Sequence, residues 1–105
     1  MQIANTPKPP YYAVIFTSQR TDGDDGYKEM SEQMLELASE QPGFLGIESA
    51  RADVGITVSY WKDIDSIELW KHNSHHIEAK KKGGEVWYSE FKLRIARVES
   101  DVQKN

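Results

Sequence analysis

The sequence predicts an α+β fold whose elements follow the order β-α-β-β-α-β. Three observations support this: alternating apolar segments near both ends of the chain, two segments with helical spacing, and a pair of strand segments between those helices. This order is the signature of a ferredoxin-like arrangement, in which two helices cover one face of a four-stranded antiparallel sheet. We expect one domain over residues 11–99, a flexible amino-terminal arm at 1–10 and a polar tail at 100–105.

The segment YYAVIFTSQR at residues 11–20 predicts the first strand. Alternate side chains of a strand point to opposite faces, and here both sets are largely apolar. The sets are Tyr12, Val14 and Phe16, and Tyr11, Ala13, Ile15 and Thr17. Apolar residues on both faces predict a strand that is covered on both sides.

Apolar residues recur at helical spacing between Tyr27 and Ala38, which predicts the first helix. Asp24 or Asp25, in the acidic turn before it, is the expected helix cap. Pro42-Gly43 ends this helix, since neither residue continues a helical pattern well.

Residues 44–52 and 54–61 predict two strands joined as a hairpin, and residues 91–98 predict the last strand. Asp63 is expected to cap the second helix, whose apolar stripe includes Trp70. Asn73-Ser74 could interrupt and restart this helix, because serine is a good cap.

Composition excludes several classes of function. A net charge of −4 argues against nucleic-acid binding, and the absence of cysteine excludes disulfides and thiolate metal sites. The first ten residues lack the pattern of a secretory signal, and no apolar run is long enough to cross a membrane. We therefore expect a soluble cytoplasmic protein without a membrane partner.

The sheet face away from the helices is predicted to carry side chains of mixed polarity. They are Ala13, Ile15, Thr17, Thr57, Ser59, Arg94 and Ala96. Leaving such a face bare would expose a large patch, so we expect a second copy of the chain to cover it in a homodimer.

Several segments resemble the antibiotic biosynthesis monooxygenase family of dimeric α/β-barrel proteins. They are YYAVIFTSQRT, QPGFLGIES, GITVSYWKDIDSIELWK with NSHH, and WYSEFKLRIARVE, so that the resemblance runs from Tyr11 to Glu99. It implies a sheet-to-sheet dimer with a pocket between sheet and helices in each protomer. It also implies oxidation of phenolic compounds to quinones without a metal, flavin or other cofactor, because the deprotonated substrate itself reduces dioxygen.

A second branch of this family degrades haem, and the chain matches that branch less well. Trp70 corresponds to its tryptophan, but Phe16 and Thr17 stand where its strand-one asparagine is expected. Lys80 or Lys81 stands where its haem-ligating histidine is expected. Haem binding is therefore the less favoured interpretation.

The residues with the most chemistry to offer are three histidines and several aromatics. His76, and next to it His75, could act as the base that takes a phenolic proton, since histidine titrates near neutrality; the alternative is a surface or capping role. His72 and His76 have the spacing of two metal ligands, but no convincing third ligand accompanies them, so we expect no metal.

The expected substrate-binding residues are Trp70, Trp61, Tyr60 and Arg94. Each has a structural alternative, since tryptophans on strand ends and helix stripes are often core residues and Arg94 could pair across a dimer. The resemblance to the family, together with these residues, therefore implies a cofactor-independent oxygenase for a small aromatic molecule. The alternative is a non-catalytic dimeric protein that binds a small molecule or is associated with stress, and fold alone does not separate the two.

Overall fold

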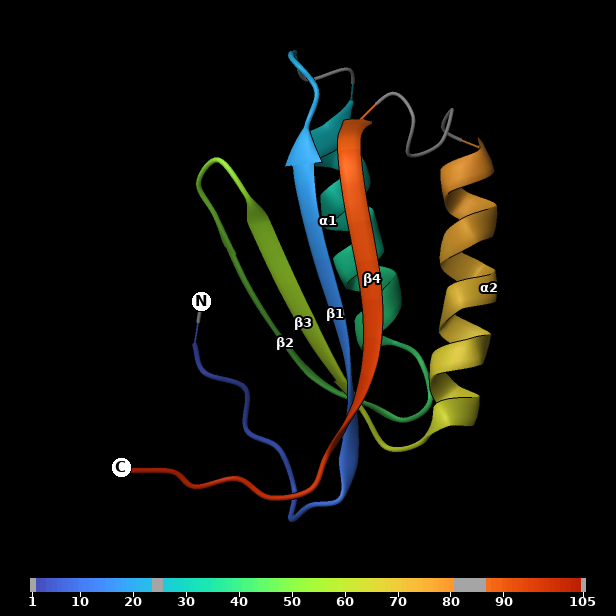
Figure 1. Cartoon of the computed structure of the whole chain (residues 1–105). Coiled ribbons are helices and arrows are strands. Elements are labelled where there is room, and N and C mark those ends of the chain that lie inside the picture. Colours follow the sequence, from blue (N-terminus) through green and yellow to red (C-terminus); the bar gives the residue numbers. More distant parts are fainter. Residues whose placement is uncertain (1, 24–25, 81–86, 105) are drawn as a thin grey trace.

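The strands and helices follow the predicted order in the computed structural model, which describes residues 2–23, 26–80 and 87–104 without the side chains of 75–80. Figure 1 shows their arrangement. They are β1 (Tyr11–Arg20), α1 (Tyr27–Ser39), β2 (Phe44–Arg51), β3 (Gly55–Trp61), α2 (Ile64–Lys80) and β4 (Tyr88–Val98). The last strand begins three residues earlier than predicted, at Tyr88 in place of Phe91.

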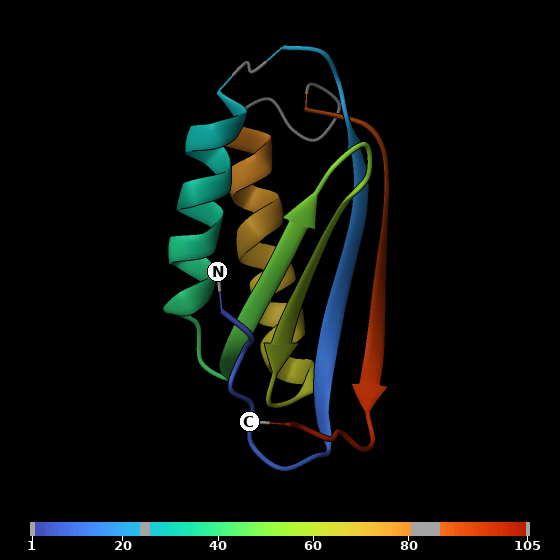
Figure 2. The same cartoon turned by 90° about the vertical axis from the view of Figure 1, so that its left-hand side faces the viewer.

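The four strands form one antiparallel sheet in the order β2-β3-β1-β4. Both helices lie on the same side of it, as Figure 2 shows. We call this the helix side and the opposite face the outer side. The predicted ferredoxin-like arrangement is therefore confirmed.

Strand β1 lies in the middle of the sheet and divides its side chains between the two sides as predicted. Paired residues on neighbouring antiparallel strands point to the same side of a sheet. Val14 belongs to a buried cluster with Trp61 and Ile67, so its set of residues faces the helices. The other set, which includes Tyr11 and Ala13, faces the outer side and is also buried at these two positions.

Thr57 and Ser59 lie on the helix side, which corrects the prediction that they face the outer side. Thr57 pairs with Phe16 and Ser59 pairs with Val14, and both partners face the helices. The hydroxyl of Ser59 accepts a hydrogen bond from Trp61 Nε1 at 2.9 Å. Both alternating sets of residues in this segment suit a strand, so alternation alone did not determine which set faces the helices.

Helix α1 begins after Gly26, which occupies the N-cap position with a φ of 81° and makes no side-chain cap bond. The expected caps, Asp24 and Asp25, lie outside the described residues. Met30 and Ala38 are each 2% exposed and anchor the helix in the core.

Helix α2 is capped by Asp63, as predicted. The backbone N–H of Ser66 donates to Asp63 Oδ1 at 2.8 Å. Bonds from the hydroxyl and the backbone N–H of Ser66 lower the pKa of Asp63, because they favour the charged carboxylate. The cap fixes the point at which the chain turns from β3 into α2.

Asn73-Ser74 does not interrupt α2, although the sequence left that possibility open, because the helix runs without a break from Ile64 to Lys80. The hydroxyl of Ser74 donates to the backbone carbonyl of Lys71 at 3.1 Å, which lets a serine sit within a helix. Among the described residues, no helix is long and apolar enough to cross a membrane.

The arm before β1 and the tail after β4 both contact the sheet. The backbone N–H of Ala4 donates to Glu48 Oε2 at 2.9 Å, and a Cβ on Gly46 would lie 2.8 Å from the Ala4 Cβ. The hydroxyl of Tyr11 donates to Asp101 Oδ2 at 2.6 Å. In Figure 1 the tail leaves the lower end of the sheet, and the arm runs from that end up beside β2.

Candidate functional site

Two groups of aromatic rings lie on the helix side of the sheet. The first, which we call the tryptophan cluster, consists of Phe44, Trp61 and Trp70. The rings of Trp61 and Trp70 stack with centroids 6.0 Å apart and planes at 22°, and Phe44 meets Trp61 edge-on at 5.4 Å. Trp61 is fully buried and Trp70 is partly exposed. Trp70 is therefore the more solvent-facing of the two tryptophans in this cluster.

The position of the tryptophan cluster follows from where β3 ends and α2 begins. Trp61 is the last residue of β3, and Asp63 caps the helix that carries Trp70. The buried Val14 and Ile67 pack in the same cluster from β1 and α2. Trp61 is therefore a core residue, and Trp70 is the tryptophan of this cluster that is partly open to solvent.

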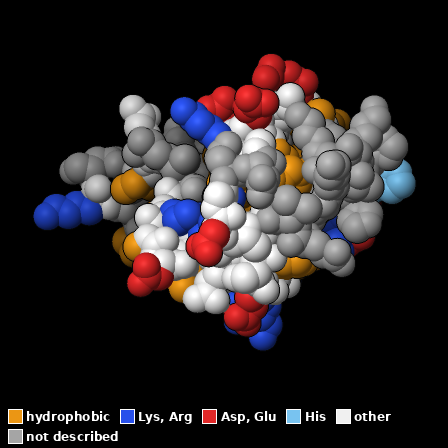
Figure 3. All heavy atoms as spheres, turned by 90° about the horizontal axis from the view of Figure 1, so that it is seen from above, with side chains coloured by type: hydrophobic (Ala, Val, Ile, Leu, Met, Phe, Trp, Pro, Cys, Tyr) orange, Lys and Arg blue, Asp and Glu red, His pale blue; other side chains and the backbone are white. Residues whose placement is uncertain are grey.

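The second group, the upper aromatic cluster, consists of Phe16, Tyr27, Tyr88 and Phe91. Phe16 lies 5.2 Å from Tyr88 and 5.5 Å from Phe91 between ring centroids, and Tyr27 meets Tyr88 edge-on at 5.8 Å. The guanidinium of Arg20 lies 3.5 Å above the centre of the Tyr27 ring, a favourable cation–π contact. Figure 3 views this end from above and shows hydrophobic side chains at the surface among charged ones.

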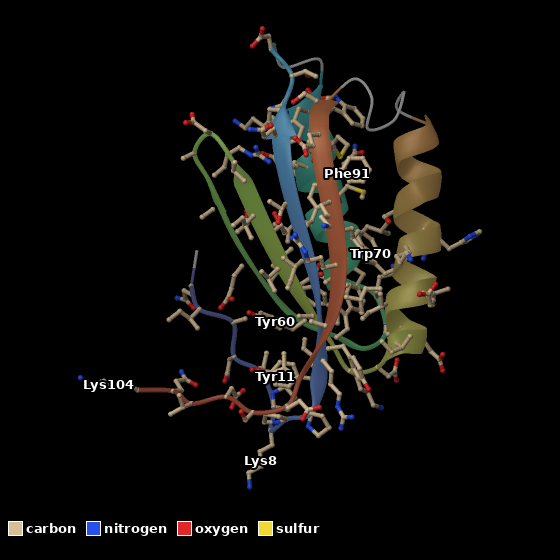
Figure 4. All side chains as sticks on the ribbon, in the orientation of Figure 1. Lys8, Tyr11, Tyr60, Trp70, Phe91 and Lys104 are labelled. Carbon is tan, nitrogen blue, oxygen red and sulfur yellow. The ribbon has the colours of Figure 1, made fainter. Side chains whose placement is uncertain are left out.

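Strand β4 carries an exposed apolar row on the helix side. Phe91, Leu93 and Ile95 pair with Ser18, Phe16 and Val14 of β1, which places all three on that side. They are nevertheless 55%, 40% and 39% exposed. Figure 4 shows Phe91 on the upper part of β4 and Trp70 between α2 and β4. An exposed apolar row beside partly buried aromatics suits the flat face of an aromatic ligand.

The predicted catalytic residues His75 and His76 lie on α2, and their side chains are not among those that the structure describes. An uninterrupted helix turns by about 100° per residue, so their positions lie roughly 120–140° around the axis from Trp70. His72 is exposed. Within the described residues, no group of three His, Cys, Asp or Glu side chains could hold a metal ion.

Tyr60, predicted to line the pocket with Trp70, lies on the outer side of the sheet. Its hydroxyl donates to Glu48 Oε1 at 2.6 Å, and its ring meets Tyr11 edge-on at 5.8 Å. Burial, with the Glu48 bond as a second cause, raises the pKa of Tyr60 to about 12. Figure 4 shows Tyr60 and Tyr11 at the lower end of the sheet, beside the terminal segments. Tyr60 and Trp70 therefore do not line one cavity within a protomer.

Arg94 also lies on the outer side, where it pairs with Ile15. It lines a shallow depression of about 280 Å³ with Lys92, Thr17 and Gln19 among others. Phe91 of the upper aromatic cluster also lines this depression, whereas no residue of the tryptophan cluster does. The structure thus divides the predicted substrate-binding residues: Trp61 and Trp70 on one side, Tyr60 and Arg94 on the other.

Sequence reasoning missed the exposed row on β4 and the partners of Glu48. Alternation placed Phe91, Leu93 and Ile95 on one face of the last strand, but nothing local indicated that the helices leave this row open. Glu48 lies 44 residues from Ala4, with which it bonds, and 12 residues from Tyr60. Contacts over such separations leave no periodic signal in a single sequence.

The family model described as "Antibiotic biosynthesis monooxygenase" matches residues 10–82, which contain β1 through α2. This chain belongs to the antibiotic biosynthesis monooxygenase family. The match confirms the resemblance drawn from the segments around the PGF turn and the two tryptophans. In this family member, the helix side of the sheet carries the aromatic clusters and the exposed row.

Relatives agree with this placement. The uncharacterized protein YqjZ of Bacillus subtilis is 52% identical over 99 residues, which cover 92% of this chain and 87% of that protein. A variant of SnoaB, a cofactor-independent oxygenase from Streptomyces nogalater, superposes with a TM-score of 0.73 at 8% identity, covering 90% of this chain and 98% of that one. PA3566 from Pseudomonas aeruginosa superposes with a TM-score of 0.67 at 14% identity, covering 91% of this chain and 99% of that one. These two structural likenesses show the shared fold.

Proposed function

We propose that this protein is a cofactor-independent monooxygenase that converts a small phenolic aromatic compound to a quinone. The observation that carries the proposal is the exposed apolar row of β4, which lies on the helix side near Trp70. Membership of the family and the fold shared with the oxygenase SnoaB support the class of reaction.

A flat aromatic ligand suits this surface for physical reasons. Phe91 and Trp70 offer ring faces and edges, and Leu93 and Ile95 offer aliphatic surface between the two ends of β4. Covering these side chains removes apolar area from water, and stacking adds a directional contribution. The partial burial of Trp70 fits a ring that forms a wall of such a site.

The proposed reaction needs no cofactor, because the substrate itself supplies the electrons that dioxygen accepts. A phenol that loses its proton becomes an electron-rich anion, which can transfer electrons to dioxygen and form a carbon–oxygen bond para to the hydroxyl. Loss of water from the resulting hydroperoxide gives a quinone. One oxygen atom of O₂ enters the product, the other leaves as water, and the substrate supplies all four electrons.

The protein's part is to bind the phenol and take its proton. His76, with His75 as the second choice, is proposed as the base, since a histidine near neutral pH can accept a phenolic proton. Both positions lie on α2 beyond Trp70. His72, on the same helix and exposed, provides a matched control.

We also propose that a second copy of the chain covers the outer side. Ile56 is 47% exposed there, and Ile15 and Val58 beside it are partly exposed. The described residues of the terminal segments form hydrogen bonds with Glu48 and Tyr11. Native mass spectrometry of the untagged protein is expected to give a dimer, and a monomer at micromolar concentration would contradict this part of the proposal.

Oxygen uptake tests the activity directly. The purified protein is incubated with 1-naphthol or anthrone in an oxygen electrode, and the product is analysed after reaction under ¹⁸O₂. We expect one ¹⁸O atom per quinone and one O₂ consumed per substrate. His76→Ala or His75→Ala is expected to slow turnover by about 10²-fold or more, while His72→Ala leaves it unchanged.

Three results would contradict the proposal. Binding of these aromatics without oxygen uptake would identify a ligand-binding protein of the same fold. Accumulation of hydrogen peroxide with no labelled product would indicate an oxidase. Wild-type activity in all three histidine variants would remove the proposed base, because then neither His75 nor His76 is needed to take the proton.

A further inference from the structure

Four residues form one row across the sheet on the helix side, at the end where Phe91 is exposed. Arg51 of β2 pairs with Gly55 of β3, Gly55 pairs with Ser18 of β1, and Ser18 pairs with Phe91 of β4. Cross-strand partners share a side of the sheet, so this row brings a cation and an exposed ring to the same surface.

The guanidinium of Arg51 is held in place by Ser18. Its Nη2 donates to Ser18 Oγ at 2.6 Å, and its Nη1 approaches the backbone oxygen of Ser18 at 3.4 Å. Ser18 is only 2% exposed, so the anchor is a buried polar group on the central strand. The side chain of Arg51 therefore reaches from β2 across β3 to β1.

Gly55 makes this reach possible. A Cβ at position 55 would collide with the guanidinium carbon and nitrogens of Arg51. The φ of Gly55 is not in the left-handed region, so its backbone conformation does not itself require glycine. Its lack of a side chain matters for the space that the Arg51 guanidinium occupies.

The charge of Arg51 has no counterion in the described part of the chain. Its contacts there are with a hydroxyl and a carbonyl of Ser18, and no carboxylate pairs with it. A guanidinium has five N–H donors, so several remain for another acceptor. Arg51 is exposed, which keeps those donors open to a molecule from solvent.

The distance along the row suits one aromatic ring system. Neighbouring strands lie about 4.8 Å apart, so the anchor on Ser18 and the backbone of Phe91 are roughly one strand spacing from each other. Phe91 is 55% exposed and leans on Phe16 and Tyr88. A ring lying on Phe91 could direct an oxygen substituent toward Arg51.

We propose that Arg51 and Phe91 form a recognition site for an aromatic compound that carries an anionic oxygen group, a carboxylate or a phenolate. The planar guanidinium binds the oxygen atoms, and Phe91 binds the ring. This inference rests on the proposed function only in placing an aromatic ligand on the helix side. It names the charge of that ligand and the residue that selects it.

Two ligands of the same shape test this inference in the whole protein. 2-Naphthoate carries a negative charge, whereas 2-naphthamide is neutral, and isothermal titration calorimetry measures the affinity of each. We expect the wild-type protein to bind the carboxylate about tenfold more tightly than the amide, because one charge-assisted pair contributes about that much.

Two variants remove the site in different ways. Arg51→Gln removes the charge, whereas Gly55→Ala keeps the charge and displaces the guanidinium from Ser18. Both are expected to reduce the preference for 2-naphthoate to less than about twofold while leaving the affinity for 2-naphthamide unchanged. Lys92→Gln, which removes the same charge from the outer side, should keep the full preference.

The outcomes separate this inference from the proposed function. An unchanged preference for 2-naphthoate in folded Arg51→Gln protein overturns the inference. An equal loss of affinity for both ligands also overturns it, because that result would show that Arg51 only ties β2 to β1. Absence of binding to either ligand in the wild type also overturns it. A preference that depends on Arg51 without any oxygen uptake supports the inference and removes only the oxygenase.

Discussion

The tryptophan cluster and the upper aromatic cluster lie on the same side of the same sheet, yet the first is built around a fully buried ring and the second includes a ring that is more than half exposed. Trp61 is fully buried, whereas Phe91 is 55% exposed. The cause lies in the connections. The closed end is where β3 runs through a capped turn into α2. Phe91, at the other end, lies on the edge strand β4, whose helix side carries an exposed apolar row.

The difference teaches that aromatic content does not by itself identify a site. A ring that is packed on every side contributes stability, and a ring that keeps one free face can bind a ligand. We therefore expect substitutions in the closed cluster to change the free energy of unfolding. Substitutions in the open cluster should change ligand affinity.

The largest expected effect is at Trp61. Replacing it with alanine removes a fully buried indole, its contacts with Phe44 and Trp70 and its bond to Ser59. We expect a loss of about 3–5 kcal/mol in the free energy of unfolding, measured by urea denaturation. Should Trp61→Ala fail to fold, Trp61→Phe provides the measurement with a smaller loss. A loss below about 1 kcal/mol would contradict the tight packing of Trp61 in the tryptophan cluster.

Two glycines with nearly the same backbone angle sharpen the comparison between the two ends. Gly43, at the closed end, has a φ of 82°, and a Cβ there would lie 2.7 Å from the Ser66 Cβ and collide with its hydroxyl. Gly26, before α1, has a φ of 81° with nothing within 4 Å of such a Cβ.

Substitution by alanine separates strain from crowding at these glycines. Gly26→Ala should cost about 1 kcal/mol for the left-handed conformation alone, and Gly43→Ala about 2–3 kcal/mol because it also displaces Ser66. Thermal and urea unfolding of both variants measure this. Equal costs would mean that α2 shifts freely away from the turn, and that the closed end is less tightly packed than the contacts indicate.

The outer side offers a pH-dependent test through Glu48 and Tyr60. The folded-state pKa of Tyr60, about 12, lies above the ordinary value of 10.0, so its stabilisation is present below pH 10 and is lost as the pH rises through 12. Glu48→Gln removes the negative charge and should lower this pKa, so that less stability is lost between these pH values than in the wild type. Ultraviolet titration of tyrosinate, with Tyr60→Phe to assign the signal, measures the shift.

The smallest expected effect on stability is at Phe91. Phe91→Ala should change the free energy of unfolding by less than about 1 kcal/mol, because more than half of this side chain is already exposed. The same variant should weaken binding of 2-naphthoate and 2-naphthamide alike by about 3- to 10-fold, since both would stack on the ring. A large loss of stability with unchanged binding would reverse the roles assigned to the two clusters.

Local pattern was sufficient for most of the fold. Alternation in β1 assigned Val14 and Ala13 to opposite sides, and the spacing of Asp63 from the strand before it identified the cap of α2. Local pattern failed at Ser59, because either alternating set of residues in that strand could have faced the helices. It failed again at Ser74, because a serine that can cap a helix also fits inside an unbroken one. In each failure, a partner distant in the sequence or a favourable backbone bond decided the outcome.

By itself, the sequence determined the order of elements, the family, and the two tryptophans that meet where β3 passes into α2. These depend on periodicity and on motifs within one segment, which a chain displays whether or not it is folded. The folded structure was needed to show that Tyr60 lies across the sheet from Trp70, that Phe91 stays exposed, and that Arg51 reaches Ser18 over Gly55. Those facts depend on the register between strands, and register arises only when distant segments pair.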